Sequence, residues 1–189
     1  MNTAYCMNYF KNESKTLLRL ISISLLLIAS TSKAEDDDLI VAERMLDAFY
    51  HFDSQALSRL LEAGEDADRV LYYQAWAEAA NYRIKDRSAC ELNDEMMIVC
   101  SITVFDDFGK TLDYTATDTF YLTVKGDKVV AARFEGDDPM IFTVLFLWIK
   151  VFRSEIFEDA CKDMFEGGDT PAECSKAVVQ AARDFTILF

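Results

Sequence analysis

Asp118 is the strongest candidate for acid–base chemistry in this sequence. Thr111 to Val124 is rich in threonine and tyrosine and alternates in polarity, which predicts a long strand. Because successive side chains of a strand point to opposite faces, one face would carry Leu112, Tyr114, Ala116, Asp118, Phe120 and Leu122. Burial among apolar neighbours raises the pKa of a carboxyl group towards the range of a general base. Asp118 could then exchange a proton with a bound molecule, with the hydroxyl group of Tyr114 one pleat away.

Asp118 also has structural explanations that need no catalysis. Its carboxyl group could accept a hydrogen bond from a backbone amide or a tyrosine hydroxyl, or it could lie where the strand bends into solvent. Asp86 is a second candidate base, because Ile84 flanks it in a shorter predicted strand. Aromatic residues that could supply the walls of a pocket are Tyr73, Trp76 and Phe120.

The sequence contains no other pattern that is typical of catalysis or metal binding. Its one histidine, His51, follows Tyr50 at the end of a predicted helix, where a capping or surface role is usual. The patterns G-x-S-x-G and H-E-x-x-H and a glycine-rich phosphate loop are all missing. Acidic runs occur at "EGDDP" and "AEDDD", but neither has the ligand spacing of a calcium loop. We therefore expect no metal site and no cofactor.

Residues 1–34 have the order of a secretory signal peptide. Three basic residues, at positions 11, 15 and 19, precede the apolar run "LISISLLLIA", and small residues at Ser32 and Ala34 suit cleavage after Ala34. An uncleaved anchor is the alternative, although ten apolar residues are too few to span a bilayer. We expect a cleaved leader, a periplasmic or secreted protein, and no stable transmembrane span in the mature chain.

The charge of the chain argues against nucleic acid as a partner. Residues 1–34 contain four basic residues and one acidic residue, so the remaining 155 residues carry 15 basic against 32 acidic residues and a net charge near −17. A protein that binds phosphates needs the opposite sign. The mature length suits one domain with a substantial core.

The cysteines predict two disulfides. Cleavage of the leader would remove Cys6 and leave four cysteines in an exported chain, which favours disulfides over metal binding or catalysis. Three pairings are possible, and the spacing favours the local one: Cys90 with Cys100 and Cys161 with Cys174.

The stretch "ACELNDEMMIVC" allows the first pairing to be tested against strand register. A three-residue loop at Asp94–Met96 would place Leu92 opposite Ile98 and Cys90 opposite Cys100. That position is a non-hydrogen-bonded pair, where the Cα separation near 4.5 Å is within disulfide range. The bridge would then face inward and fix the register of a hairpin.

Around these residues the pattern predicts an α+β protein. Helical stripes occur over residues 39–52, over a short segment capped by Asp53 or Ser54 and ended by Gly64, and over residues 67–82. The period then changes to two, which predicts a four-stranded antiparallel meander. Its expected strands are residues 83–88, 100–104, 111–124 and 128–134.

Residues 139–189 are expected to be a helical extension that packs on this domain. Pro139 opens the helix "MIFTVLFLWIKVF", which is apolar nearly all round and so is either fully buried or docked on a partner. The residues expected at such an interface are Phe142, Phe146 and Ile149. After this helix, Gly167-Gly168 separates two helices that the Cys161–Cys174 disulfide would join as a hairpin.

Three helices followed by a long antiparallel meander resemble the nuclear transport factor 2-like superfamily, which includes ketosteroid isomerases and SnoaL-like cyclases. The resemblance rests on "AERMLDAFYHFDSQALSRLL" (Ala42 to Leu61) and "DTFYLTVKGDKVVAARFEGDDP" (Asp118 to Pro139), and it covers about Leu39 to Asp138. It implies a domain over residues 35–138 in which a curved sheet and the helices form a cone around a pocket. It also implies, for enzymes of the superfamily, a buried base and a hydroxyl that holds an oxyanion.

Two functions follow as expectations. The first is an exported, non-catalytic module that holds a small apolar ligand or a protein partner and that could form a homodimer. The second is a ketosteroid isomerase-like enzyme with Asp118 or Asp86 as base and Tyr114 as electrophile. The first is preferred because the sequence shows no clear acid–base pair, and fold alone does not establish an enzyme.

Overall fold

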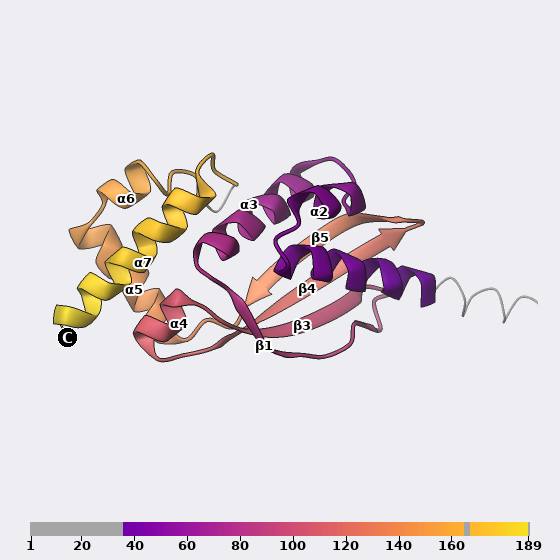
Figure 1. Ribbon diagram of the computed structural model, residues 1–189, viewed down its shortest axis with the longest axis horizontal. Helices are drawn as coiled ribbons and strands as arrows, with labels where there is room; N and C mark the ends of the chain where they lie inside the picture. Colours follow the sequence, from indigo (N-terminus) through magenta and orange to yellow (C-terminus); the bar gives the residue numbers. More distant parts are fainter. Residues whose placement is uncertain (1–35, 165–166, 189) are drawn as a thin grey trace, which may run out of the picture. The chain divides into compact units, whose positions relative to one another are not determined.

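Four antiparallel strands form the main path of the sheet, in the order β1-β3-β4-β5 (Figure 1). A two-residue strand, β2, also pairs with β3. The strands span Arg83–Arg87 (β1), Glu91–Leu92 (β2), Ile98–Phe105 (β3), Ala116–Lys125 (β4) and Lys128–Gly136 (β5). All named strand pairs are antiparallel, so the predicted α+β class and the four-stranded meander are confirmed.

The computed structural model describes residues 36–164 and 167–188. The predicted signal peptide, with Cys6 and the cleavage position at Ala34, lies outside these residues. Residues 39–189 form one compact unit, and residues 36–38, at the end of the preceding unit, are helical. Within the described ranges no helix is both long enough and apolar enough to cross a membrane.

Three helices precede the sheet along the chain: residues 36–50, α2 (Ser54–Leu60) and α3 (Glu65–Ala79). The side chain of Asp53 caps α2, as predicted, by accepting a hydrogen bond from the backbone N–H of Ala56 at 2.8 Å. Gln74 on α3 is buried and donates from its amide group to the carbonyl oxygen of Ala48 at 2.9 Å. This bond joins α3 to the last turn of the first helix.

The three helices share a core with the inner face of the sheet. Alternate residues of β3 and β4 are buried, as strand parity predicts. They pack against apolar residues of the first helix and α2, among them Met45, Phe49 and Leu57. The buried residues of the two strands are Ile98, Cys100, Ile102, Val104, Ala116, Asp118, Phe120, Leu122 and Val124.

Residues 106–115 differ from the prediction of a turn and a continuing strand. Asp107–Leu112 form a short helix, α4, and Asp106 caps it by accepting a hydrogen bond from the N–H of Gly109 at 2.6 Å. Asp113, with φ of 59°, ends the helix. β4 therefore begins at Ala116, and Leu112 and Tyr114 do not belong to the strand face that carries Asp118.

The C-terminal part of the unit contains three helices, α5 (Met140–Phe152), α6 (Glu155–Glu158) and α7 (Pro171–Leu188). α7 packs against α3, α4, α5 and α6 around a second core, which includes Phe108, Leu145 and Val178. The Cys161–Cys174 disulfide is present, with a Cα separation of 4.5 Å. Cys161 lies in a turn region after α6, which has only four residues, so the predicted hairpin of two helices is shorter than expected.

The Cys90–Cys100 disulfide has the predicted register. Glu91 pairs with Val99 and Leu92 with Ile98, and the two bonded cysteines have a Cα separation of 4.4 Å and are buried. The bridge is therefore an inward staple across the hairpin.

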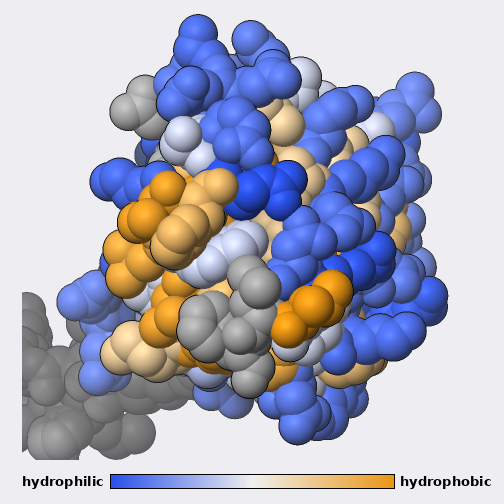
Figure 2. Space-filling view, turned by 90° about the vertical axis from the view of Figure 1, so that its left-hand side faces the viewer, coloured by the Kyte–Doolittle hydropathy of each residue, from blue (hydrophilic) through white to orange (hydrophobic). Residues whose placement is uncertain are grey.

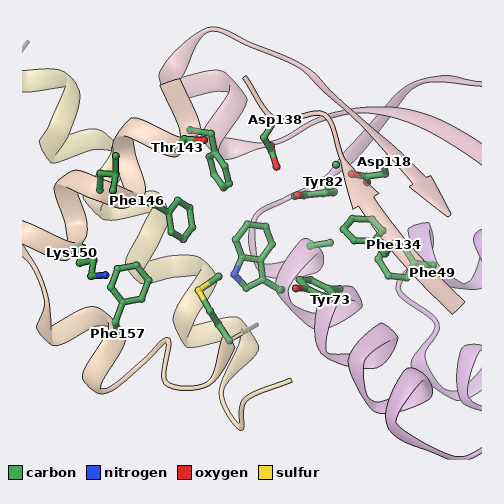
Figure 3. A pocket seen from close by; sticks show the side chains of 16 residues that line it. Phe49, Tyr73, Tyr82, Asp118, Phe134, Asp138, Thr143, Phe146, Lys150 and Phe157 are labelled. Atoms are coloured by element: carbon green, nitrogen blue, oxygen red, sulfur yellow. The ribbon is translucent and has the colours of Figure 1, made fainter. Parts of the chain in front are cut away.

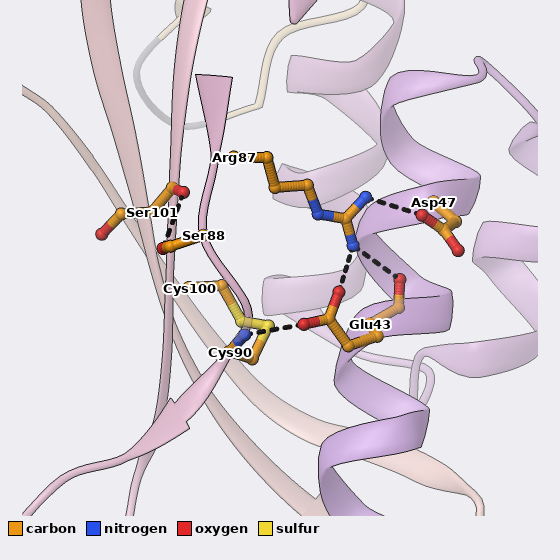
Figure 4. The surroundings of a disulfide bond; sticks show 7 residues. All are labelled: Glu43, Asp47, Arg87, Ser88, Cys90, Cys100 and Ser101. Carbon is orange, nitrogen blue, oxygen red and sulfur yellow. Dashed lines mark hydrogen bonds and ion pairs between the residues drawn. A yellow bond between two sulfur atoms is a disulfide. The ribbon is translucent and has the colours of Figure 1, made fainter.

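The first helix holds this hairpin in place (Figure 4). Glu43 accepts a hydrogen bond from the backbone N–H of Cys90 at 2.6 Å, and its carboxylate also pairs with Arg87. Arg87 forms a second ion pair with Asp47 at 2.6 Å. One arginine and one glutamate thus join β1 and the disulfide to the same face of the helix.

Candidate functional site

A pocket of about 590 Å³ lies between the sheet and the C-terminal helices (Figure 3). Its size is that of typical sites for small molecules. The first helix, α3, β4, β5 and α5 all contribute to it, so distant parts of the chain must fold before it exists. The lining residues are Phe49, Tyr73, Trp76, Ala77, Tyr82, Asp118, Phe134, Gly136, Asp138, Phe142, Thr143, Phe146, Leu147, Lys150, Phe157 and Met164.

Aromatic rings form most of the walls. Tyr73 stacks on Phe134 with ring centroids 5.3 Å apart. Across the pocket, Phe142 and Phe146 of α5 have centroids 4.7 Å apart, and Phe146 contacts Phe157 at 5.9 Å. Offset and edge-to-face contacts of this kind hold the rings in defined orientations. The walls are therefore apolar and rich in π surface.

Asp118 lies at one end of this pocket. It occupies the inner face of β4 opposite Gly136 of β5, and only 3% of its surface is exposed. The hydroxyl group of Tyr50 donates a hydrogen bond to Asp118 Oδ2 at 2.6 Å. Burial raises the pKa of Asp118 to about 7, while the bond from Tyr50 opposes that rise. Of the structural explanations offered by the sequence, the hydrogen bond from a tyrosine hydroxyl is the one observed.

Other carboxylates surround the same end of the pocket. A Cβ atom added to Gly136 would lie 3.2 Å from Asp138 Oδ2 and 4.0 Å from Asp118 Oδ1, so both carboxylates border the space above this glycine. Asp138 is an exposed residue, but partial desolvation of its carboxyl group, and then repulsion by Asp137, raises its pKa to about 6. Burial is also the main reason why the pKa of Asp106, at the start of α4, rises to about 6.

Two further polar groups line the pocket. The pKa of Tyr82 is raised well above its ordinary value, first by burial and then by the charges of Asp118, Asp106 and Asp138. Trp76 is 7% exposed, and its indole Nε1 is buried without a hydrogen-bond partner in the described part of the chain. The ring of Trp76 stacks on Phe108 with centroids 4.8 Å apart, which fixes its orientation.

The structure brings only some of the predicted site residues together. Tyr73 and Trp76 line the pocket as predicted, and Phe120 lies behind its wall, 4.9 Å from Phe134 between ring centroids. Asp86 is exposed on β1, next to an irregularity in strand pairing, and does not line the pocket. It is therefore not the buried carboxylate that its apolar neighbour suggested.

Tyr114 is also displaced from its expected position beside Asp118. It lies between α4 and β4, does not line the pocket, and its ring contacts Phe142 at 6.2 Å. Burial raises the pKa of Tyr114 above its ordinary value, and Asp106 and Asp138 add to the effect. The hydroxyl group bonded to Asp118 comes instead from Tyr50.

The apolar residues of helix α5 that are exposed are not the ones expected at an interface. Ile149 is fully buried, and Phe142 and Phe146 are half-buried in the pocket wall. The exposed large apolar residues of α5 are Met140, Val144, Leu147, Val151 and Phe152. Figure 2 shows apolar side chains gathered on the face that carries the C-terminal helices.

Sequence reasoning missed Tyr50, Tyr82 and Asp138. Tyr50 belongs to the apolar stripe of the first helix, and Asp138 belongs to the acidic "EGDDP" run, whose spacing does not fit a calcium loop. Among the residues that the structure describes, no group of three or more histidine, cysteine or carboxylate side chains is arranged to hold a metal ion.

Comparisons of the chain with models of protein families, with curated proteins and with solved structures return no match.

Proposed function

We propose that this protein is an exported, non-catalytic binding module of the nuclear transport factor 2-like kind, which holds a small, largely apolar ligand in the pocket bordered by Asp118. The observation that carries the proposal is the pocket itself, about 590 Å³ in volume and walled mainly by aromatic side chains. Burial of apolar ligand surface against such walls contributes about 25 cal/mol per Å² before the costs of binding are subtracted.

Export and superfamily are parts of the same proposal. Two disulfides are typical of a protein that folds in an oxidising compartment, which supports the leader expected from the sequence. Three helices followed by a four-stranded antiparallel sheet have the element order of the superfamily.

The arrangement around Asp118 favours binding over catalysis. Oδ2 of Asp118 is already occupied by the hydroxyl group of Tyr50, and Tyr114 does not line the pocket. A general base needs a second group that stabilises the charge formed on the substrate. Within the described residues no such donor is paired with the free oxygen of Asp118.

The test is to block the pocket with one side chain and to compare a neighbouring control. Thr143 lines the pocket on α5, whereas the adjacent Val144 is exposed and does not line it. Binding of the uncharged fluorescent probe N-phenyl-1-naphthylamine would be measured by titration. We expect Thr143→Trp to weaken binding at least about tenfold and Val144→Trp to leave it unchanged, because only the first residue occupies ligand space. Equal binding by both variants, or no binding by the wild type, would refute the proposal.

A second candidate function is acid–base catalysis by Asp118, and one observation favours it. A carboxyl group with a pKa of about 7 inside an apolar pocket has the proton affinity expected of a general base. Isomerisation of a β,γ-unsaturated ketone, followed by the absorbance of its conjugated product, tests this candidate. Turnover that is lost in Asp118→Asn and kept in Tyr114→Phe would support it, with Tyr50 or Tyr82 in place of Tyr114 as the electrophile. No turnover by the wild type would end this candidate.

A further inference from the structure

The end of the pocket at Asp118 carries negative charge without a basic partner. Within the described residues, ion pairs join arginines to seven other carboxylates, but none involves Asp118, Asp137 or Asp138. Among the described lining residues one is basic, Lys150, and it lies beside Phe157 at the opposite end, as Figure 3 shows. The charges at the acidic end therefore repel one another, and no basic side chain in the described ranges forms an ion pair with them.

Asp118 cannot relieve this repulsion by turning into solvent. It is 3% exposed, and Tyr50 holds its Oδ2. Its Oδ1 borders the space above Gly136, which Asp138 Oδ2 also borders. No hydrogen bond within the described chain occupies Oδ1. A small positive group in this space could contact both carboxylates at once.

Aromatic rings complete the surroundings of that space. Tyr82, Phe134 and Trp76 line the pocket together with the two carboxylates, and the Trp76 and Tyr82 rings are 6.0 Å apart between centroids. The faces of such rings attract cations, most strongly where water is excluded. A carboxylate pair next to π faces is a combination that suits an organic ammonium group better than a metal ion, which would require several further oxygen ligands.

We propose that the ligand is an apolar organic cation, whose protonated amine lies above Gly136 between Asp118 and Asp138 while its apolar body fills the aromatic part of the pocket. This inference rests on the proposed function, because it names the class of ligand for the same pocket. A charge-assisted hydrogen bond is stronger than a neutral one, so the amine is the specificity-determining group of the ligand.

Binding of a cation should depend on pH. The groups that face Asp118 are Tyr50 from the first helix, Tyr82 after α3, Asp106 at the start of α4, and Asp137 and Asp138 after β5. The tyrosines stay neutral, since burial raises the pKa values of both. The cation binds the ionised form of Asp118, whose pKa is about 7, so the affinity should rise about tenfold from pH 6 to pH 8.

The test compares a charged probe with its neutral counterpart. Isothermal titration calorimetry would measure 4-phenylbutylamine and 4-phenylbutan-1-ol with the full chain at pH 6 and pH 8. We expect the amine to bind at least about tenfold more tightly than the alcohol at pH 8, a preference that shrinks at pH 6. The alcohol should show no such increase between pH 6 and pH 8, because it gains nothing from ionisation of the carboxylates.

Variants assign the preference to the two carboxylates. Asp118→Asn keeps an acceptor for the Tyr50 hydroxyl group, and Asp138→Asn changes an exposed residue, so both should fold. Each should remove most of the preference for the amine and leave the affinity for the alcohol within about twofold. Asp127→Asn, in the exposed turn between β4 and β5, removes one charge away from the pocket and controls for net charge.

The outcomes separate this inference from the proposed function. Equal binding of amine and alcohol by the wild type would overturn the cation assignment while the pocket still bound apolar molecules. A preference that survives in both Asp118→Asn and Asp138→Asn would also overturn it. Binding of neither probe, together with no binding of N-phenyl-1-naphthylamine, would refute the proposed function itself.

Discussion

Replacing Asp118 with asparagine should stabilise the protein at alkaline pH and leave its stability nearly unchanged at acidic pH. In the folded protein, burial raises the pKa of Asp118 from the ordinary value of 3.8 to about 7. The unfolded chain loses this proton near the ordinary value. Between these two pH values the folded state holds one more proton than the unfolded state, so folding becomes less favourable as the pH rises.

The size of the effect follows from the two pKa values. The difference between 3.8 and about 7 corresponds to about 4 kcal/mol, at about 1.36 kcal/mol per pH unit. The contribution of Asp118 is fully present below pH 4 and is lost as the pH rises to 7. Asparagine keeps the acceptor for the hydroxyl group of Tyr50 but carries no charge at any pH. Asp106 and Asp138 remain in both proteins, so the difference in stability reports the ionisation of Asp118 together with its repulsion by these two carboxylates.

Urea unfolding at several pH values, with the disulfides intact, measures this difference. The free energy of unfolding of Asp118→Asn minus that of the wild type should be within about 1 kcal/mol of zero at pH 4 and should reach about 4 kcal/mol at pH 8. Asp127→Asn serves as the control for loss of one charge. A difference that is independent of pH, or that becomes more negative as the pH rises, would show that Asp118 is not a desolvated acid.

Three further substitutions test the scaffold by urea unfolding. Replacing both Cys90 and Cys100 with alanine removes a cross-link between residues ten positions apart, which should lower the free energy of unfolding by about 3 kcal/mol in the chain-entropy model. A decrease below about 1 kcal/mol would count against a stabilising role for this disulfide. Gln74→Leu should lower the free energy of unfolding by about 0.5–1.5 kcal/mol, because it removes the hydrogen bond from Gln74 to Ala48, whose carbonyl oxygen keeps its bond from the N–H of Asp53. A neutral effect would contradict that contribution. Gly109→Ala should lower the free energy of unfolding by more than about 2 kcal/mol, because the added Cβ would overlap a backbone carbonyl oxygen. Gly64→Ala is the matched control, because a Cβ there meets no atom within 4 Å.

The fold was predictable wherever a local pattern decides the structure. Asp53 provides a side-chain acceptor at the start of α2, and the register of the Cys90–Cys100 hairpin follows from the parity of its loop. Alternation along residues 116–124 correctly placed Asp118 and Phe120 on the buried face. These features depend on neighbours within a few residues along the chain.

The remainder depends on contacts between distant segments. Tyr114 follows a helix because Asp106 caps α4, although the threonines and tyrosines of this region favour a strand. The pairing irregularity between Ile84 and Asp86, together with the exposure of β1, explains why Asp86 is not buried. α5 is apolar nearly all round, so its own sequence does not determine which of its sides is buried. Packing against α7 decides this.

The candidate site shows the same division. Strand parity identified Asp118, but its partner Tyr50 is 68 residues away, and no periodicity connects the two. Asp138 comes close to Asp118 only because β5 returns antiparallel beside β4 and ends opposite it, at Gly136. The chemistry of the pocket therefore arises from topology and not from a motif.

The two disulfides also bear on how the chain matures. Each joins cysteines that are consecutive along the described chain, 10 and 13 residues apart. When a chain emerges from its N-terminal end, Cys90 meets Cys100 before Cys161 or Cys174 is available, so neither of the later cysteines can compete for the first bond. Among these four cysteines, the native pairing can then form without thiol–disulfide exchange, which is slow. The order of the bonded cysteines thus favours formation of the two disulfides in sequence.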